Sequence, residues 1–256
     1  MSEPLVLIDR FPAGYAILTF NRPTTLNALS QALRRQFCAA VDALAADPSV
    51  CVLILTGRGR VFSAGLDLKE WQETSGIAGG AFDDDPVRAM ARFSGPTIGA
   101  INGLAITGGF EIAAACDLLF ATPETRFIDT HVHAGLLPGW GLSARLARSI
   151  GVCRAKALSL TGTPLTAVQA EAWGFVYRVV QADTLLAEAQ ALAERMFASD
   201  RETLIAYKAL IDDGFSMTLA DALAMERERA MVANALVDPK VVQARLAILR
   251  EGNRQG

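Results

Sequence analysis

Residues 97–111 read TIGAINGLAITGGFE, in which an apolar run is followed by several glycines and ends on an acidic residue. Residues 97–101 are nearly all apolar, which is typical of a short strand covered on both faces. Glycines then lead the chain toward a helix at Ile112. At a helix start the free N–H groups point outward, and two of them aimed at one point would form an oxyanion hole. Glycine spacing alone favours the plainer interpretation, an ordinary strand-to-helix turn.

The segments on either side repeat this pattern. Two further apolar runs predict buried strands, at residues 50–56 and 118–122, and residues 30–46 have the spacing of an amphipathic helix behind a Ser30 cap. Residues 6–9 and 15–20 predict a hairpin. The alternation predicts an α/β fold with a parallel sheet covered by helices.

The pattern changes after residue 184. Four helices are expected with no strand between them, at residues 185–197, 202–211, 219–235 and 239–250. We therefore expect a core at residues 1–184 and a C-terminal helical region at 185–256. A region this small cannot bury much core of its own, so we expect it to dock on a neighbouring subunit. Such docking would also account for a mean hydropathy of +0.29.

Composition excludes several classes of function. The 24 basic and 27 acidic residues give a net charge of −3, with no basic stripe for a nucleic acid. No apolar run reaches the 18 or so residues of a membrane span, and the N-terminus does not resemble a signal peptide. Four dispersed cysteines predict a reducing cytoplasm. The two histidines lie far from any cysteine, so no metal site is expected.

Other segments carry candidate chemistry. Residues 61–69, VFSAGLDLK, form a second glycine turn, and residues 135–141 form a third that leads into a helix. Residues 72–86 predict a mobile surface loop, and their aspartates are interpreted as solvated charge rather than a cation site. Glu111 lies in the first turn of an alanine-rich helix. It is either a residue that caps the helix or complements its dipole, or a general acid/base with a pKa raised by burial.

His131 and His133 would face the same side if their segment were extended. A hydrogen-bonded structural role is the ordinary interpretation of a lone histidine. Asp129 could orient an imidazole only if the chain turned there, which the sequence leaves open.

Taken together, these segments resemble the crotonase family, the enoyl-CoA hydratase/isomerase superfamily. The residues that carry the resemblance are NRP (21–23), LNAL (26–29), FSAGLDLK (62–69), NG (102–103), GGFE (108–111), CDL (116–118), PG (138–139) and Gly141. Their order and separations match over nearly the whole chain. The resemblance implies a spiral of ββα units with a C-terminal helical region that builds trimers, often paired into hexamers.

The resemblance also implies an acyl-CoA site, with coenzyme A as part of the substrate and no separate cofactor. The thioester oxygen would lie between the N–H groups of Leu66 and Gly108, where fixed donors stabilise an enolate. Glu111 matches the first of two catalytic glutamates. The substrate-binding positions implied are Arg22, Ala64, Gly65, Asp67, Lys69, Gly109, Pro138 and Gly139, with Arg22 and Lys69 as candidates to meet the CoA phosphates.

The sequence departs from the family pattern at two places. The second glutamate is expected seven residues before Pro138, where this chain has His131, and a lysine expected near position 24 is replaced by Thr24 and Thr25. An imidazole, with an ordinary pKa of about 6.5, can still exchange protons at neutral pH. The leading hypothesis is a hydratase that adds water to a 2-enoyl-CoA through Glu111 and His131. The alternatives are another enolate reaction (isomerase, decarboxylase or C–C hydrolase) or a non-catalytic acyl-CoA-binding protein.

Overall fold

The computed structural model describes residues 3–73 and 84–252, and the side chains up to residue 245. The chain divides into two compact units, residues 1–205 and 206–256. Most of the predicted surface loop at residues 72–86 lies outside the described residues.

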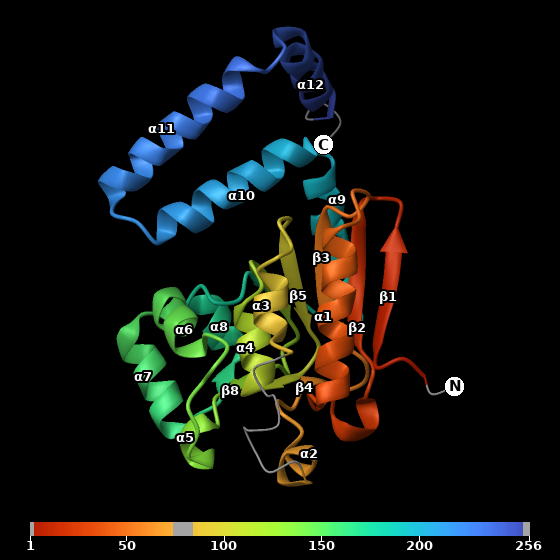
Figure 1. The fold of residues 1–256 in the computed structure, drawn as a ribbon, viewed down its shortest axis with the longest axis vertical. Helices are drawn as coiled ribbons and strands as arrows, with labels where there is room; N and C mark the ends of the chain where they lie inside the picture. Colours follow the sequence, from red (N-terminus) through yellow and green to blue (C-terminus); the bar gives the residue numbers. More distant parts are fainter. Residues whose placement is uncertain (1–2, 74–83, 253–256) are drawn as a thin grey trace. The chain divides into compact units, whose positions relative to one another are not determined.

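The larger sheet of the first unit has six strands in the order β1-β2-β3-β5-β7-β10 (Figure 1). Its strands are β1 (Val6–Phe11), β2 (Tyr15–Phe20), β3 (Val52–Gly57), β5 (Thr97–Ile101), β7 (Leu118–Ala121) and β10 (Arg178–Val179). β1 and β2 form the predicted antiparallel hairpin, and every other neighbouring pair is parallel. The predicted parallel sheet is confirmed.

A second sheet was not predicted from the sequence. It contains β4 (Val61–Ser63), β6 (Leu104–Ile106), β8 (Arg126–Ile128) and β9 (Leu165–Thr166), in that order. The chain passes from the first sheet to the second three times, from β3 to β4, from β5 to β6 and from β7 to β8. After each passage it enters a helix. This repetition is the predicted spiral of ββα units.

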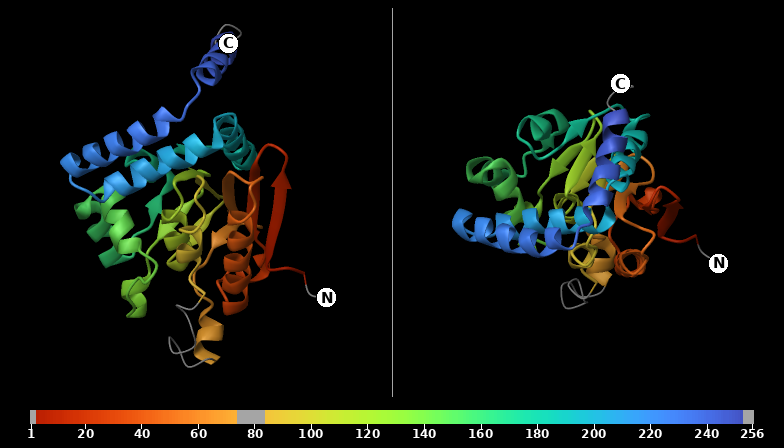
Figure 2. Two further views of the ribbon diagram at one scale, coloured as in Figure 1. Left: turned by 45° about the horizontal axis from the view of Figure 1, so that its top comes forward. Right: turned by 90° about the horizontal axis from the view of Figure 1, so that it is seen from above.

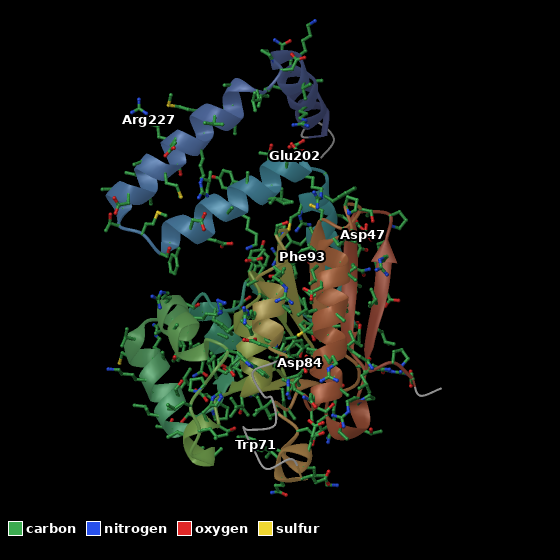
Figure 3. All side chains as sticks on the ribbon, in the orientation of Figure 1. Asp47, Trp71, Asp84, Phe93, Glu202 and Arg227 are labelled. Carbon is green, nitrogen blue, oxygen red and sulfur yellow. The ribbon has the colours of Figure 1, made fainter. Side chains whose placement is uncertain are left out.

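Helices cover both faces of the larger sheet, as the continuous apolar strands require. In β3, Leu53 and Leu55 pack in the core with α1 (Gln31–Ala45), whereas Val52 and Ile54 pack in a second cluster with α9 (Leu185–Phe197). Along the first face α1, α3 (Pro86–Met90) and α4 (Gly108–Ala114) lie side by side (Figure 2). Phe93, which follows α3, is buried in this core (Figure 3).

The remaining helical elements of the first unit are short and occupy the connections. They are η1 (Pro23–Thr25), α2 (Leu68–Glu73), α5 (His131–Ala134), α6 (Leu142–Ile150), α7 (Val152–Thr161) and α8 (Ala167–Ala172). Ser30 caps α1 as predicted, because its hydroxyl accepts from the N–H of Leu33 at 3.3 Å.

The second unit is helical. α10 (Arg201–Phe215) reaches into it and is followed by α11 (Leu219–Ala235) and α12 (Pro239–Gly252). No side chain described in α10 or α11 is buried, although both helices carry large apolar residues such as Phe215, Leu219 and Val232. None of the helices described is both long and apolar enough to span a membrane.

Candidate active site

The carboxylate of Glu111 is held at the start of two helices. Glu111 lies in the first turn of α4, as predicted, and only 2% of its surface is exposed. Its Oε1 accepts hydrogen bonds from the backbone N–H of Trp140 at 2.8 Å and of Leu142 at 3.4 Å, where α6 begins. The turn that contains Pro138 and Gly139 therefore orients this carboxylate, which leaves Oε2 available for chemistry.

Burial raises the pKa of the Glu111 carboxyl above its ordinary value. The two N–H groups and the nearby His131 oppose this effect without cancelling it. Glu111 thus holds its proton to a higher pH than an exposed glutamate. A raised pKa fits the interpretation of Glu111 as a general acid/base, whose catalytic role stays a prediction, and the carboxylate also accepts N–H groups at the start of α6.

The histidine segment is not extended, so the condition under which His131 and His133 would face the same side is not met. β8 ends at Ile128, the chain turns, and α5 begins at His131. His131 is buried, whereas His133 is exposed and its Nε2 lies 3.0 Å from the carbonyl oxygen of Thr161. Because the chain is helical here, the two imidazoles do not share one side.

Asp129 occupies the turn before α5. Its Oδ1 lies 2.7 Å from Nδ1 of His131 and also accepts the backbone N–H of His131 at 3.1 Å. Burial works against ionisation of Asp129, but hydrogen bonds from His131 and Ser159 outweigh it and lower the pKa of the carboxyl. The condition under which Asp129 could orient the imidazole, a turn at this point, is met.

The Nε2 of His131 consequently faces Glu111, and it lies 3.7 Å from Oε2. This separation is too long for a direct hydrogen bond, which needs about 2.7–3.2 Å. It allows one water molecule to bond to both atoms at about 2.8 Å. The pair can therefore hold water between two groups that accept and release protons.

The two glycine turns meet backbone against backbone beside this pair. A methyl group at Gly109 would lie 2.6 Å from the carbonyl oxygen of Ser63, and one at Gly65 would lie 2.8 Å from the carbonyl oxygen of Ile106. Gly65 also has a φ of +85°, which few other residues adopt. This contact requires glycine, and it brings the turn that carries Leu66 against the start of α4.

The N–H groups of Leu66 and Gly108 have no hydrogen-bond acceptor within the described parts of the chain. Thr107, just before Gly108, has a positive φ of 49°, and its N–H donates to the carbonyl of Ile128 at 2.8 Å. Its hydroxyl lies 2.5 Å from that of Thr130. These bonds tie the glycine turn to the segment that carries His131.

Arg22 and Asp67 form an ion pair at 3.0 Å, and Arg22 also donates to the carbonyl of Ala28 at 2.7 Å. Burial opposes ionisation of Asp67, but its bonds to Arg22 and to the start of α2 lower the pKa of this carboxyl. The predicted phosphate contact of Arg22 would have to share its guanidinium with these partners. Lys69, on α2, is exposed, and Ala64 is half-buried.

Asn27 is a positioning residue whose role sequence reasoning missed, although it lies in the LNAL motif. Its side chain is fully buried, donates to the carbonyls of Arg58 and Val61, and accepts the N–H of Arg22. Its backbone carbonyl accepts the hydroxyl of Ser63 at 2.9 Å. Asn27 thereby fixes the loop that enters the Gly65 turn.

Fold and site together define an α/β protein of ββα units, in which a buried carboxylate and an imidazole lie beside two interlocked glycine turns. The family model for enoyl-CoA hydratase/isomerase matches residues 10–238. The chain belongs to this family, the crotonase family.

Individual relatives support the assignment. A probable peroxisomal enoyl-CoA hydratase 1 of Arabidopsis thaliana is 42% identical over 90% of this chain and 87% of the relative. A 2,3-dehydroadipyl-CoA hydratase of Escherichia coli strain K12 is 36% identical over 83% of this chain and 84% of that protein. A crystal structure of an enoyl-CoA hydratase from Mycobacterium smegmatis has a TM-score of 0.87 at 32% identity and covers 97% of each chain.

Proposed function

We propose that this protein adds water to the double bond of a 2-enoyl-CoA thioester. The observation that carries the proposal is the buried pair of Glu111 and His131, whose reactive atoms face each other at 3.7 Å beside the glycine turns. The relatives named as hydratases support the same reaction. Coenzyme A belongs to the substrate, and no further cofactor is required.

The thioester oxygen would accept hydrogen bonds from the N–H groups of Leu66 and Gly108. Attack of water on the β-carbon moves electrons onto this oxygen and forms an enolate. Fixed donors stabilise the enolate more than the ground-state carbonyl, and each typically lowers the barrier by about 3–4 kcal/mol. The turn positions around them, namely Ala64, Gly65, Asp67 and Gly109, would form the walls of this thioester site, together with Pro138 and Gly139.

The proton transfers follow from the environments of the two side chains. Nε2 of His131 removes a proton from the water, and the hydroxide oxygen bonds to the β-carbon. Glu111, whose pKa burial raises, gives its proton to the α-carbon as the enolate collapses. The proton on His131 then crosses to Oε2 of Glu111, which restores both groups for the next cycle.

Glu111→Gln tests the proposal. Glutamine keeps an oxygen for the N–H of Trp140 but carries no transferable proton, so hydration of crotonyl-CoA should fall by about 10³-fold or more. The exposed Glu124→Gln serves as a matched control and should retain full rate. Full activity in Glu111→Gln would overturn the hydratase assignment.

A second candidate is favoured by His131 itself, because an imidazole stands where a hydratase would have its second glutamate. Another enolate reaction, namely isomerisation, decarboxylation or C–C bond cleavage, would use the same oxyanion hole. A third reading is an acyl-CoA-binding protein without turnover. Incubation with enoyl-CoA thioesters of graded chain length, followed by mass analysis of the products, separates hydration, these reactions and simple binding.

We further propose that the helical region assembles the protein into a homotrimer or homohexamer. The exposed apolar residues of α10 and α11 support this, because single chains seldom leave so much apolar surface in water. A trimer or hexamer on size-exclusion chromatography with light scattering is expected, and a clean monomer would contradict it. The dispersed free cysteines support a cytoplasmic location.

A further inference from the structure

We propose that Asp129 is a positioning residue for the reaction: it holds His131 in the Nδ1–H tautomer, so that the lone pair of Nε2 faces the water and Glu111. The inference rests on the proposed function and deepens it, because it assigns the base to His131 and the acid to Glu111. Asp129 belongs to neither of the glutamate positions implied by the family resemblance.

The geometry of Asp129 is that of a built contact. The residue is 3% exposed, and one oxygen, Oδ1, receives both Nδ1 and the backbone N–H of His131. A neutral imidazole carries one N–H, and a carboxylate can only accept, so a distance of 2.7 Å places the proton on Nδ1. The bond from the backbone N–H fixes the carboxylate relative to α5, and the bond to Nδ1 then holds the ring in place.

The charges around the imidazole agree with this assignment. In the described part of the chain, the ionisable groups that face it are Asp129 on one side and Glu111, from α4, on the other. α7 also packs against α5, but its Arg154 and Lys156 are exposed to solvent, and its Ser159 is uncharged. An imidazolium formed when Nε2 takes the water proton is thus stabilised by the anionic Asp129 before it passes that proton to Glu111.

The tautomer can be measured directly. The chain has two histidines, so His133→Gln leaves one imidazole. The ¹⁵N chemical shifts of this imidazole, measured at a pH where the ring is neutral, identify the protonated nitrogen. We expect Nδ1–H in this background and a shift toward Nε2–H when Asp129→Ala is added. An Nε2–H tautomer in His133→Gln, where Asp129 is intact, would overturn the inference, whether or not the further variant Asp129→Ala folds.

Kinetics separate positioning from a merely structural role. Asp129→Asn keeps an acceptor for the backbone N–H but removes the charge, so kcat for crotonyl-CoA should fall by about 10²-fold. KM should stay within about twofold, because the proposed thioester contacts come from other segments. The acidic limb of the kcat profile, along which the proposed base His131 must lose its proton, should move to lower pH, since the imidazolium loses its anionic neighbour. An unchanged kcat and pH profile would contradict the proposal.

Control variants keep the two hypotheses distinct. His133→Gln alone should leave hydration unchanged, because the exposed side chain of His133 contacts the carbonyl of Thr161 and, among the described residues, has no contact with Glu111 or His131. If Glu111→Gln abolishes hydration while Asp129→Asn leaves it untouched, the inference about Asp129 fails and the proposed function stands. If Glu111→Gln retains full activity, the proposed function fails, and the tautomer measurement still decides the role of Asp129.

Discussion

Glu111 and His131 face each other, but the regions that hold them differ in kind. Glu111 is held by uncharged N–H groups at the start of α6, and burial raises its pKa. His131 is held by an ionised carboxylate, Asp129, which accepts from the ring itself. A proton added to Glu111 removes a buried charge, whereas a proton added to His131 creates a positive charge that the neighbouring Asp129 carboxylate stabilises. The leading causes differ, although His131 also lowers the pKa of Glu111, so a mutation on one side should alter the two members of the pair unequally.

On the His131 side of the pair, removal of the imidazole should have the largest effect on the rate of hydration. His131→Ala deletes the proposed base, and hydration of crotonyl-CoA should fall by about 10³-fold, within the range known for general acid–base catalysis. The limb of the pH profile that depends on the imidazole should also disappear. His133→Ala is the matched control. A non-catalytic acyl-CoA-binding protein would bind its ligand equally well with or without His131, which titration calorimetry can measure.

The two regions also differ in how far the sequence predicts them. Glu111 follows an apolar strand and lies at the start of an alanine-rich helix. The residues next to it in the sequence are therefore enough to predict its place in the first turn of α4. Residues 127–133 carry no signal that separates a strand from a turn, and the turn here is held by contacts from distant residues, Thr107 to Thr130 and Ser159 to Asp129. The bond between Asp129 and His131 could therefore only be stated as a condition.

The same contrast holds for the fold. β5 and α9 have the bounds that the sequence predicts, because a buried strand and an amphipathic helix each repeat over many residues. β4 and β8 have three residues each, and a strand this short does not show a recognisable hydrophobic period in the sequence. Their pairing with β6 through the second sheet brings the glycine turns together, and no local signal reports such pairing.

A smaller loss of kcat is expected when a substitution separates the two glycine turns but leaves Glu111 and His131 in place. In Gly109→Ala the new methyl group would lie 2.6 Å from the carbonyl oxygen of Ser63 and 2.8 Å from its Cβ, so α4 must shift away from the Gly65 turn. If Leu66 and Gly108 donate to the thioester oxygen, kcat should fall by about 10²-fold, the typical cost of losing one donor.

A glycine outside the site provides the control for this substitution. Gly214→Ala adds a methyl group in α10, where the nearest atom is 3.5 Å away, and it should leave hydration unchanged. A full rate in Gly109→Ala, with a circular dichroism spectrum like that of the parent, would exclude the proposed oxyanion hole at this contact.

The smallest expected effect is on the unfolding temperature, and it should have opposite signs for Glu111→Gln and Asp129→Asn. The pKa of Glu111 is raised above its ordinary 4.5 in the folded protein, so ionisation costs stability as the pH rises above 4.5. Glu111→Gln stays neutral, and it should unfold at a higher temperature than the parent at pH 8, with the difference narrowing toward pH 4.

The pKa of Asp129 is lowered from 3.8, so the stability that its ionised carboxylate contributes is present above that pH and is lost as the pH falls. Asp129→Asn should therefore unfold at a lower temperature at pH 8, and it should approach the parent in acid. Thermal unfolding followed by circular dichroism from pH 8 down to about pH 2 measures both, because the contribution of Asp129 is lost only below pH 3.8. If both variants shifted in the same direction at pH 8, the opposite electrostatic control of the two groups would be excluded.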